Sequence, residues 1–165
     1  KDYAIPLGTA DLKRKGNDLS IITYGIGVHL ALEASERLAS EGIVVEILDL
    51  RTLLPLDTDA IKQTVAHTRK VLVLHEDNKT GGIGAEVAAL IVEESFEELD
   101  GPIRRLAAAD THVAYAPALE EAILPNADDV VVAARKVAES AHGCRAEHRE
   151  VDDERLAATA ARSRQ

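Results

Sequence analysis

The sequence predicts an α/β domain of three layers, with helices covering both faces of a mainly parallel central sheet. Four short runs rich in Val, Ile and Leu alternate with helical segments between residues 19 and 140, which is typical of parallel sheets with helical crossovers. Hydrophobic residues make up 46% of the chain and aromatic residues only 2%. The core is therefore expected to be aliphatic, which suits close packing of helices on a sheet.

The first strand and helix are predicted after a short N-terminal stretch. Residues 4–8 are expected to be extended, and residues 13–18 to form a charged turn. Residues 19–24 are a continuous apolar, β-rich run of the kind found in buried strands. Residues 28–40 carry apolar side chains at helical spacing, and Gly42 stands where a helix C-cap is expected.

The remaining elements continue the same alternation. Asp57 is a suitable N-cap for a helix. The helical segment over residues 85–96 is apolar on most of its surface and is expected to be buried. The predicted elements are strands over residues 44–49, 70–75 and 103–107, helices over residues 58–67, 85–96 and 128–140, and a loop over residues 78–84.

Composition limits the domain organisation and the classes of partner. Residues 1–140 are expected to form one domain, followed by a polar, flexible tail over residues 141–165. The chain begins at Lys1 without Met, as a fragment or processed chain would, and its single cysteine, Cys144, favours a reducing cytosol. No apolar run approaches the roughly 20 residues of a membrane span. The net charge of -10 and the few aromatic rings argue against nucleic-acid binding.

His75 and Glu76 are the weak candidates for a catalytic site. They follow the third predicted strand, and open α/β sheets place their functional crevice at this edge. A histidine beside carboxylates can transfer protons or bind a metal, but no second ligand stands at a supporting spacing. The alternative is that these side chains hold loops together through hydrogen bonds.

Two glycine turns precede predicted helices and resemble parts of anion-binding motifs. Gly25 and Gly27 begin a dinucleotide fingerprint, but Leu30 replaces its third glycine. The turn over residues 80–84 lacks the Lys-Ser/Thr pair of a P-loop. A free-standing anion- or nucleotide-binding module remains one hypothesis, and glycines that only allow close backbone packing are the other.

The segment over residues 49–57 is the most distinctive in the chain. A strand leads into the charged residues Asp49 and Arg51, then into an apolar loop with Pro55, then to the cap Asp57. The leucines of this loop require an apolar surface, either in this domain or in a neighbour.

A series of motifs resembles the C-terminal, transketolase-type domain of 2-oxo acid dehydrogenase E1 β subunits. The motifs occur in family order over residues 3–10, 18–25, 46–57, 80–86, 99–103, 109–111 and 115–120. Residues 28–29 and 75–76 resemble the branched-chain (2-oxoisovalerate) type more than the pyruvate type. Transketolase and deoxyxylulose-phosphate synthase share the fold and remain alternatives.

The resemblance implies roles for particular residues. Structural roles fall to the strand-loop-helix motif and to the glycine loop: Asp49, Arg51, Pro55, Asp57, Gly81, Gly82, Gly84 and Glu86. Candidates for docking a partner are Asp110, Tyr115 and Glu120. The stretch over residues 112–114 and the tail after residue 140 depart from the family pattern.

The resemblance also implies a division of labour. The full enzyme is an oxidoreductase that decarboxylates a 2-oxo acid with thiamin diphosphate and Mg²⁺, which are bound outside this domain. No catalytic, cofactor or metal residue is carried over to the chain, which alone is expected to be inactive. The implied partners are an E1 α subunit and a second E1 β in a heterotetramer, and the subunit-binding domain of the E2 acyltransferase. The implied location is the bacterial cytoplasm or the mitochondrial matrix.

Overall fold

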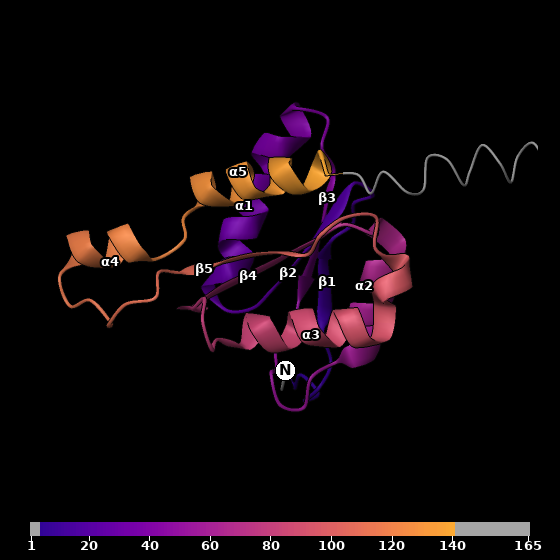
Figure 1. The fold of residues 1–165 in the computed structure, drawn as a ribbon, viewed down its shortest axis with the longest axis horizontal. Coiled ribbons are helices and arrows are strands. Elements are labelled where there is room, and N and C mark those ends of the chain that lie inside the picture. Colours follow the sequence, from indigo (N-terminus) through magenta and orange to yellow (C-terminus); the bar gives the residue numbers. More distant parts are fainter. Residues whose placement is uncertain (1–3, 141–165) are drawn as a thin grey trace, which may run out of the picture.

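The computed structural model describes residues 4–140 as a five-stranded sheet of order β1-β3-β2-β4-β5 with helices on both faces (Figure 1). All strand pairs are parallel except β1 with β3. The predicted three-layer α/β fold is confirmed. The elements are β1 (Asp11–Arg14), β2 (Leu19–Thr23), α1 (Ile26–Ser40), β3 (Val45–Asp49), α2 (Thr58–Thr68), β4 (Val71–Asn78), α3 (Ile83–Ser95), the 3₁₀ turn η1 (Phe96–Glu98), β5 (Arg104–Ala108), α4 (Pro117–Ile123) and α5 (Ala127–Ala138).

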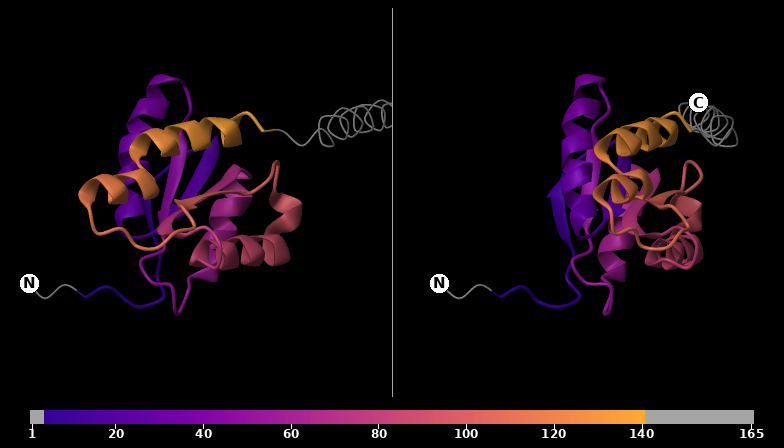
Figure 2. Two further views of the ribbon diagram at one scale, coloured as in Figure 1. Left: turned by 60° about the vertical axis from the view of Figure 1, so that its left-hand side comes forward. Right: turned by 90° about the vertical axis from the view of Figure 1, so that its left-hand side faces the viewer.

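Two aliphatic cores lie on opposite faces of the sheet, because successive side chains of a strand point to opposite sides. Ile21 and Ile22 of β2 illustrate the alternation: Ile21 packs beneath α1 and α5, and Ile22 packs against α2 and α3. Figure 2 shows the two helix pairs as separate layers. Each continuous apolar run that was predicted to be a strand therefore contributes side chains to both cores.

Side-chain caps fix where two of the covering helices begin. Oδ1 of Asp57 accepts a hydrogen bond from the N–H of Ala60 at 3.1 Å, as its predicted N-cap role requires. Asn126 and Asp129 form a capping box at the start of α5. These caps satisfy backbone donors that would otherwise lack partners in the first helical turn.

Four details differ from the sequence-based expectations. Part of the expected charged turn forms β1, an edge strand, and α4 was not expected. β4 continues to Asn78, because Asn78 pairs with Ala108 beyond an irregularity in register. The expectation that the helix after the glycine loop is buried over most of its surface is wrong: α3 buries one face, and Phe96 at its end is 62% exposed.

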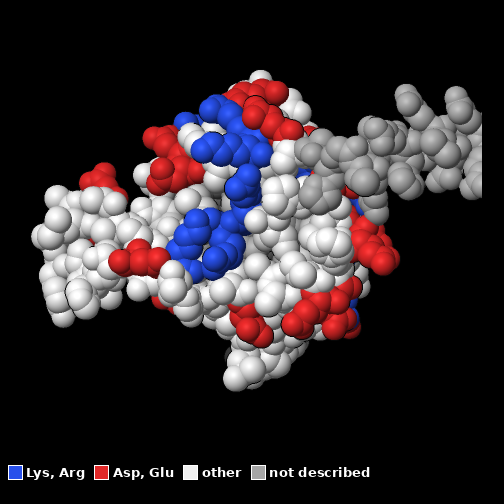
Figure 3. All heavy atoms as spheres, in the orientation of Figure 1, with Lys and Arg blue, Asp and Glu red and all other residues white. Residues whose placement is uncertain are grey.

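The domain presents two further features that bear on function. The segment that carries α4 projects from the body of the domain (Figures 1 and 2). Lys and Arg side chains gather in a band over α5 and β5, although the chain as a whole is acidic (Figure 3).

Among residues 4–140, no helix is both long and apolar enough to cross a membrane. The predicted tail and Cys144 lie outside the described residues.

Candidate functional site

The carboxyl ends of β2 and β4 form the edge where an α/β sheet of this topology binds ligands. The chain leaves β2 for β3 on one side and later returns to β4 on the other, so the connections diverge between these neighbouring strands. A hollow of about 290 Å³ lies at this edge, lined by Gly27, His75, Glu76 and Glu120 among others. The structure thus brings the two catalytic candidates together with one docking candidate.

His75 is a packing residue in this arrangement. Its side chain is buried, and neither ring nitrogen has a hydrogen-bond partner within residues 4–140. Burial lowers the pKa of His75 below its ordinary value, which keeps the imidazole neutral. Glu76 is exposed and makes no hydrogen bond to the ring.

The glycine loop is shaped by His75 and not by a phosphate cradle. A Cβ at Gly84 would lie 2.2 Å from Nε2 of His75, and a Cβ at Gly82 would lie 2.2 Å from the carbonyl oxygen of Asn78. Only glycine lets the loop approach this closely. The exposed Glu86 lies in the first turn of α3, where a carboxylate favours the helix dipole but opposes an incoming anion.

The turn after β2 is likewise filled by the protein's own atoms. Gly25 has φ of 58°, in the left-handed region that favours glycine. A Cβ at Gly27 would lie 2.2 Å from Oγ1 of Thr23. Gly27, Gly82 and Gly84 therefore allow close packing within the domain, whereas a Cβ at Gly81 would meet nothing within 4 Å.

Residues 49–57, called the signature loop below, fasten the N-terminal segment to the sheet. Oδ1 of Asp49 accepts from the N–H of Arg51 at 3.0 Å, and the guanidinium of Arg51 donates to Asp11 at 2.6 Å. Oδ2 of Asp57 accepts from the N–H of Ala10 at 2.9 Å, so one carboxylate joins the N-terminal segment to the start of α2. Every charged side chain of the motif thus has a structural partner.

The apolar side chains of the signature loop divide between the domain and its surroundings. Leu53 and Leu56 pack against the core beneath α2 and α3. Pro55 adjoins Gly8, where a Cβ would lie 2.9 Å from its ring, and the peptide bond before Pro55 is cis. Leu54 is 94% exposed. Of the two alternatives that the sequence left open, cover of this domain holds for Leu53 and Leu56, and Leu54 remains exposed.

Residues 109–124, called the arm below, carry the docking candidates. Asp110 binds at the base of the arm: its oxygens accept from the Thr80 N–H at 2.8 Å and the Thr80 hydroxyl at 2.7 Å. These hydrogen bonds lower the pKa of Asp110 below its ordinary value. Tyr115 is 99% exposed and Glu120 is exposed on α4. Tyr115 and Glu120 are therefore available to a partner, whereas Asp110 positions the arm.

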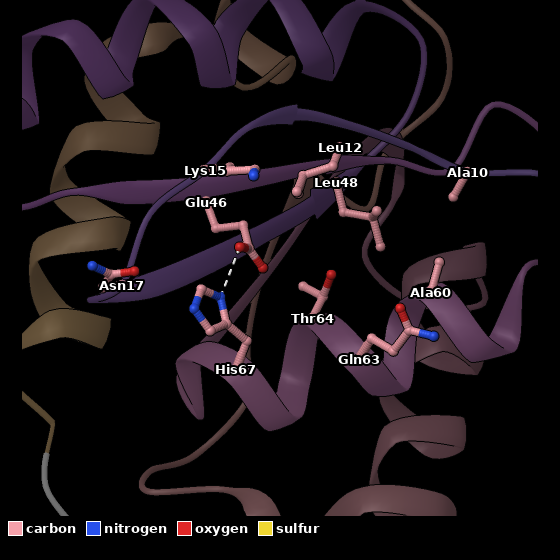
Figure 4. A pocket seen from close by; sticks show the side chains of 10 residues that line it. All are labelled: Ala10, Leu12, Lys15, Asn17, Glu46, Leu48, Ala60, Gln63, Thr64 and His67. Atoms are coloured by element: carbon pink, nitrogen blue, oxygen red, sulfur yellow. Dashed lines mark hydrogen bonds and ion pairs between the residues drawn. The ribbon is translucent and has the colours of Figure 1, made fainter.

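A buried carboxylate that the sequence reasoning missed lies in a hollow of about 490 Å³ between β1, β3 and α2 (Figure 4). Glu46 is 3% exposed; its Oε2 lies 2.9 Å from Nδ1 of His67, and its Oε1 accepts from Ser20 at 3.3 Å. The carboxylate lies between the serine and the histidine, so His67 cannot activate Ser20 as a nucleophile. An acidic residue in a run expected to be buried was the available signal, because such a charge requires partners.

The described residues do not fit a metal or a diphosphate cofactor. Within residues 4–140, no group of three or more His, Cys, Asp or Glu side chains could hold a metal ion. At the carboxyl edge, Thr23, His75 and the backbone of β4 lie close to Gly27, Gly84 and Gly82 respectively.

Comparison with known proteins gives a family match and close relatives. Residues 8–130 match the family model described as transketolase, C-terminal domain. The chain is 48% identical to 2-oxoisovalerate dehydrogenase subunit beta and 46% identical to pyruvate dehydrogenase E1 component subunit beta, both of Bacillus subtilis, over 84% of this chain and 42% of each relative. A mitochondrial pyruvate dehydrogenase E1 subunit beta-1 of Arabidopsis thaliana is 40% identical over 81% of this chain and 37% of the relative. The chain thus spans less than half the length of these relatives.

Solved structures share the fold. A split-gene transketolase, described as an inactive beta4 tetramer, superposes with a TM-score of 0.72 and 28% identity over 86% of this chain and 45% of that chain. A 2-oxoglutarate:ferredoxin oxidoreductase from Magnetococcus marinus gives a TM-score of 0.55 with 16% identity, over 79% of this chain and 20% of that chain. The second likeness concerns the fold alone.

Proposed function

The chain belongs to the transketolase C-terminal domain family, and from this premise we propose that it is the C-terminal domain of the β subunit of a 2-oxo acid dehydrogenase E1 component. Its role in that subunit is assembly of the E1 oligomer and docking of the E2 acyltransferase. The observation that carries the proposal is the 48% identity to a 2-oxoisovalerate dehydrogenase β subunit over 84% of the chain. The same observation favours this reading over transketolase or a free-standing nucleotide-binding module.

A branched-chain 2-oxo acid is the proposed substrate of the whole enzyme. The branched-chain relative has the higher identity, 48% against 46% for the pyruvate relative. The substrate pocket is expected outside this domain, because the hollow at the carboxyl edge holds no paired catalytic groups within residues 4–140. The relatives come from bacteria and from mitochondria, which suits a bacterial cytoplasm or a mitochondrial matrix as the location.

Thiamin diphosphate and Mg²⁺ are proposed to bind to other parts of the enzyme. In support, the described residues offer no metal-ligand cluster, and Gly27, Gly82 and Gly84 pack closely against the protein's own atoms. The chain's own contribution is then mechanical: the signature loop fastens its N-terminal segment, and the exposed Leu54 and the arm present surfaces for neighbouring subunits.

Cofactor binding tests this division of labour. The isolated chain and the assembled α and β subunits are each titrated with thiamin diphosphate and Mg²⁺ by calorimetry. We expect no measurable heat of binding for the isolated chain, and binding with turnover of 2-oxoisovalerate, faster than that of pyruvate, for the assembly. Tight cofactor binding by the isolated chain would contradict the proposal.

A second experiment tests the docking role of the arm. The E1 assembly is titrated with the subunit-binding domain of E2, which is expected to present a basic face to the acidic arm. Tyr115→Ala and Glu120→Lys should each weaken binding about tenfold or more, because exposed aromatic and charged side chains commonly dominate such contacts. Glu36→Lys, the same charge change on the exposed surface of α1, is the matched control. Equal affinities for all three variants would show that the arm is not the docking site of the E2 subunit-binding domain.

A further inference from the structure

We propose that a groove between α5 and β5 docks an acidic, extended segment of a partner protein, at a surface separate from the arm. The basic groove, as it is called here, is lined by the cations Arg104, Arg105 and Lys136 and by apolar side chains including Leu106 and Val132. Its volume is about 460 Å³. The proposal does not depend on the identity of the enzyme, because it rests on charge and shape alone.

Among the residues that the structure describes, the cations of the basic groove lack acidic partners, in contrast to their neighbours. Arg37 and Arg135 are each 2.5 Å from a carboxylate, that of Asp128 and Glu41 respectively. Within residues 4–140, Arg104 and Lys136 form no ion pair. Arg105 donates to the carbonyl oxygen of Lys79 at 2.8 Å, which leaves its charge unneutralised.

The acidic side chain on the lining cancels only part of this charge. Asp129 belongs to the capping box of α5, where its Oδ2 accepts from the N–H of Asn126 at 3.1 Å. Three cations therefore face one committed carboxylate, on a chain whose net charge is -10. Figure 3 shows the resulting band of Lys and Arg over α5 and β5, with acidic side chains around it. Such a local reversal of sign attracts an acidic partner.

The apolar part of the groove indicates a peptide segment as the occupant. Val132 is 48% exposed beside the cations, so a ligand with both acidic and apolar side chains uses the groove more fully than a small anion. β5 is the last strand of the described sheet, and its outer edge offers backbone hydrogen-bonding groups to an extended chain. The groove lining contains no aromatic side chain on which nucleic-acid bases could stack.

Peptide binding to the full-length protein in its natural assembly tests the proposal. A fluorescein-labelled Glu-Val-Glu-Glu-Leu-Glu peptide is the probe, and anisotropy is measured at low and high salt. We expect saturable binding that weakens as salt rises. The double variant Arg104→Glu with Lys136→Glu should lose about tenfold or more in affinity. Val132→Ser should lose a smaller factor without altering the salt dependence, because it changes the apolar wall only.

Matched controls separate this site from general charge effects. Lys15→Glu makes one such charge reversal on an exposed residue near the opposite, β1 edge of the sheet and should bind the peptide as the unaltered protein does. A Gln-Val-Gln-Gln-Leu-Gln peptide should not bind. Absence of saturable binding, or equal loss in Lys15→Glu, would overturn the proposal. Tighter binding of a single-stranded oligonucleotide than of the peptide would also overturn it. A tenfold gain in peptide affinity on deletion of residues 141–165 would overturn it too, because that result would mean that these residues of the chain itself occupy the groove.

Discussion

The signature loop and the arm are both recognisable segments, but the domain holds them in opposite ways. Arg51 and Asp57 of the signature loop bind to segments far away in sequence, Asp49 accepts a hydrogen bond within the loop, and two of its leucines enter a core. The arm is fastened at its base, where Asp110 binds Thr80, and then exposes Tyr115 almost completely. The first segment stabilises the fold, and the second leaves its side chains free for a partner.

A recognisable motif can therefore serve either the stability of the domain or the binding of a partner. A carboxylate such as Asp57, which joins the N-terminal segment to a helix start, has its hydrogen-bonding capacity used within the domain. An exposed aromatic side chain such as Tyr115 contributes little to folding, because its apolar surface stays in water. Substitutions in the two regions should therefore divide cleanly between stability and binding.

The largest loss of stability is expected in the glycine loop, whose Thr80 anchors the arm and whose Gly84 packs on His75. Gly84→Ala places a methyl group 2.2 Å from the original position of Nε2 of His75, and such overpacking costs about 1–3 kcal/mol. Chemical denaturation measures the loss. His75→Ala in the same chain should recover part of it, with a coupling energy of about 1 kcal/mol or more in a double-mutant cycle. Strictly additive effects would show that the glycine is required for another reason.

A loss of comparable size is expected in the signature loop itself. Asp57→Ala removes the acceptor for the N–H groups of Ala60 and Ala10, at a cost of about 2 kcal/mol for a lost cap and a lost hydrogen bond. The midpoint of urea unfolding should fall at an unchanged slope. Asp57→Asn retains an acceptor and a capping side chain, so it should lose less. Equal losses in the two variants would point to charge and not to capping.

A local, pH-dependent change is expected at the base of the arm. The folded-state pKa of Asp110 lies below its ordinary value of 3.8. Its contribution is therefore fully present above pH 3.8 and is lost as the pH falls through the lower, folded-state value. Amide hydrogen exchange in residues 109–124 should accelerate in that acid range relative to the sheet. Asp110→Asn should exchange faster already near neutral pH, with a flatter pH dependence.

The smallest effect on stability is expected at the tip of the arm. Tyr115→Ser should change the unfolding free energy by less than about 0.5 kcal/mol, as is usual for exposed positions without internal partners. Thermal unfolding of the isolated chain measures this. A large loss would mean that Tyr115 packs within the domain, and the contrast between the two regions would fail.

The sequence predicted most of the fold because its strands supply both cores. Runs such as residues 19–24 have no polar face, and Asp57 stands at a helix start as a cap, so both signals are local. β1 was missed because an edge strand with one partner tolerates the charged side chains of Asp11, Lys13 and Arg14. α4 was missed because it is short and buries none of its residues, although Pro117 at its first turn was a usable signal.

The site was less predictable because its properties depend on contacts between distant segments. The position of His75 after an apolar run suggested a functional edge, but nothing local shows that its ring lies beneath Gly82 and Gly84. The partner of Glu46 is a histidine on α2, 21 residues further along the chain. The basic groove joins residues of β5 and α5 about 30 positions apart. Such pairings appear only once the sheet order and the helix layers are known.

The arm leaves the sheet at β5 and returns to it through α5, and this double attachment has a mechanical consequence. Its two ends are joined by the Ala109 N–H, which donates to the carbonyl oxygen of Ile123 at 3.0 Å. A pull on the tip is therefore shared between an edge strand and a helix that packs over the central strands. A force that a bound partner exerts on the arm would be divided between β5 and α5, so neither attachment would carry all of it.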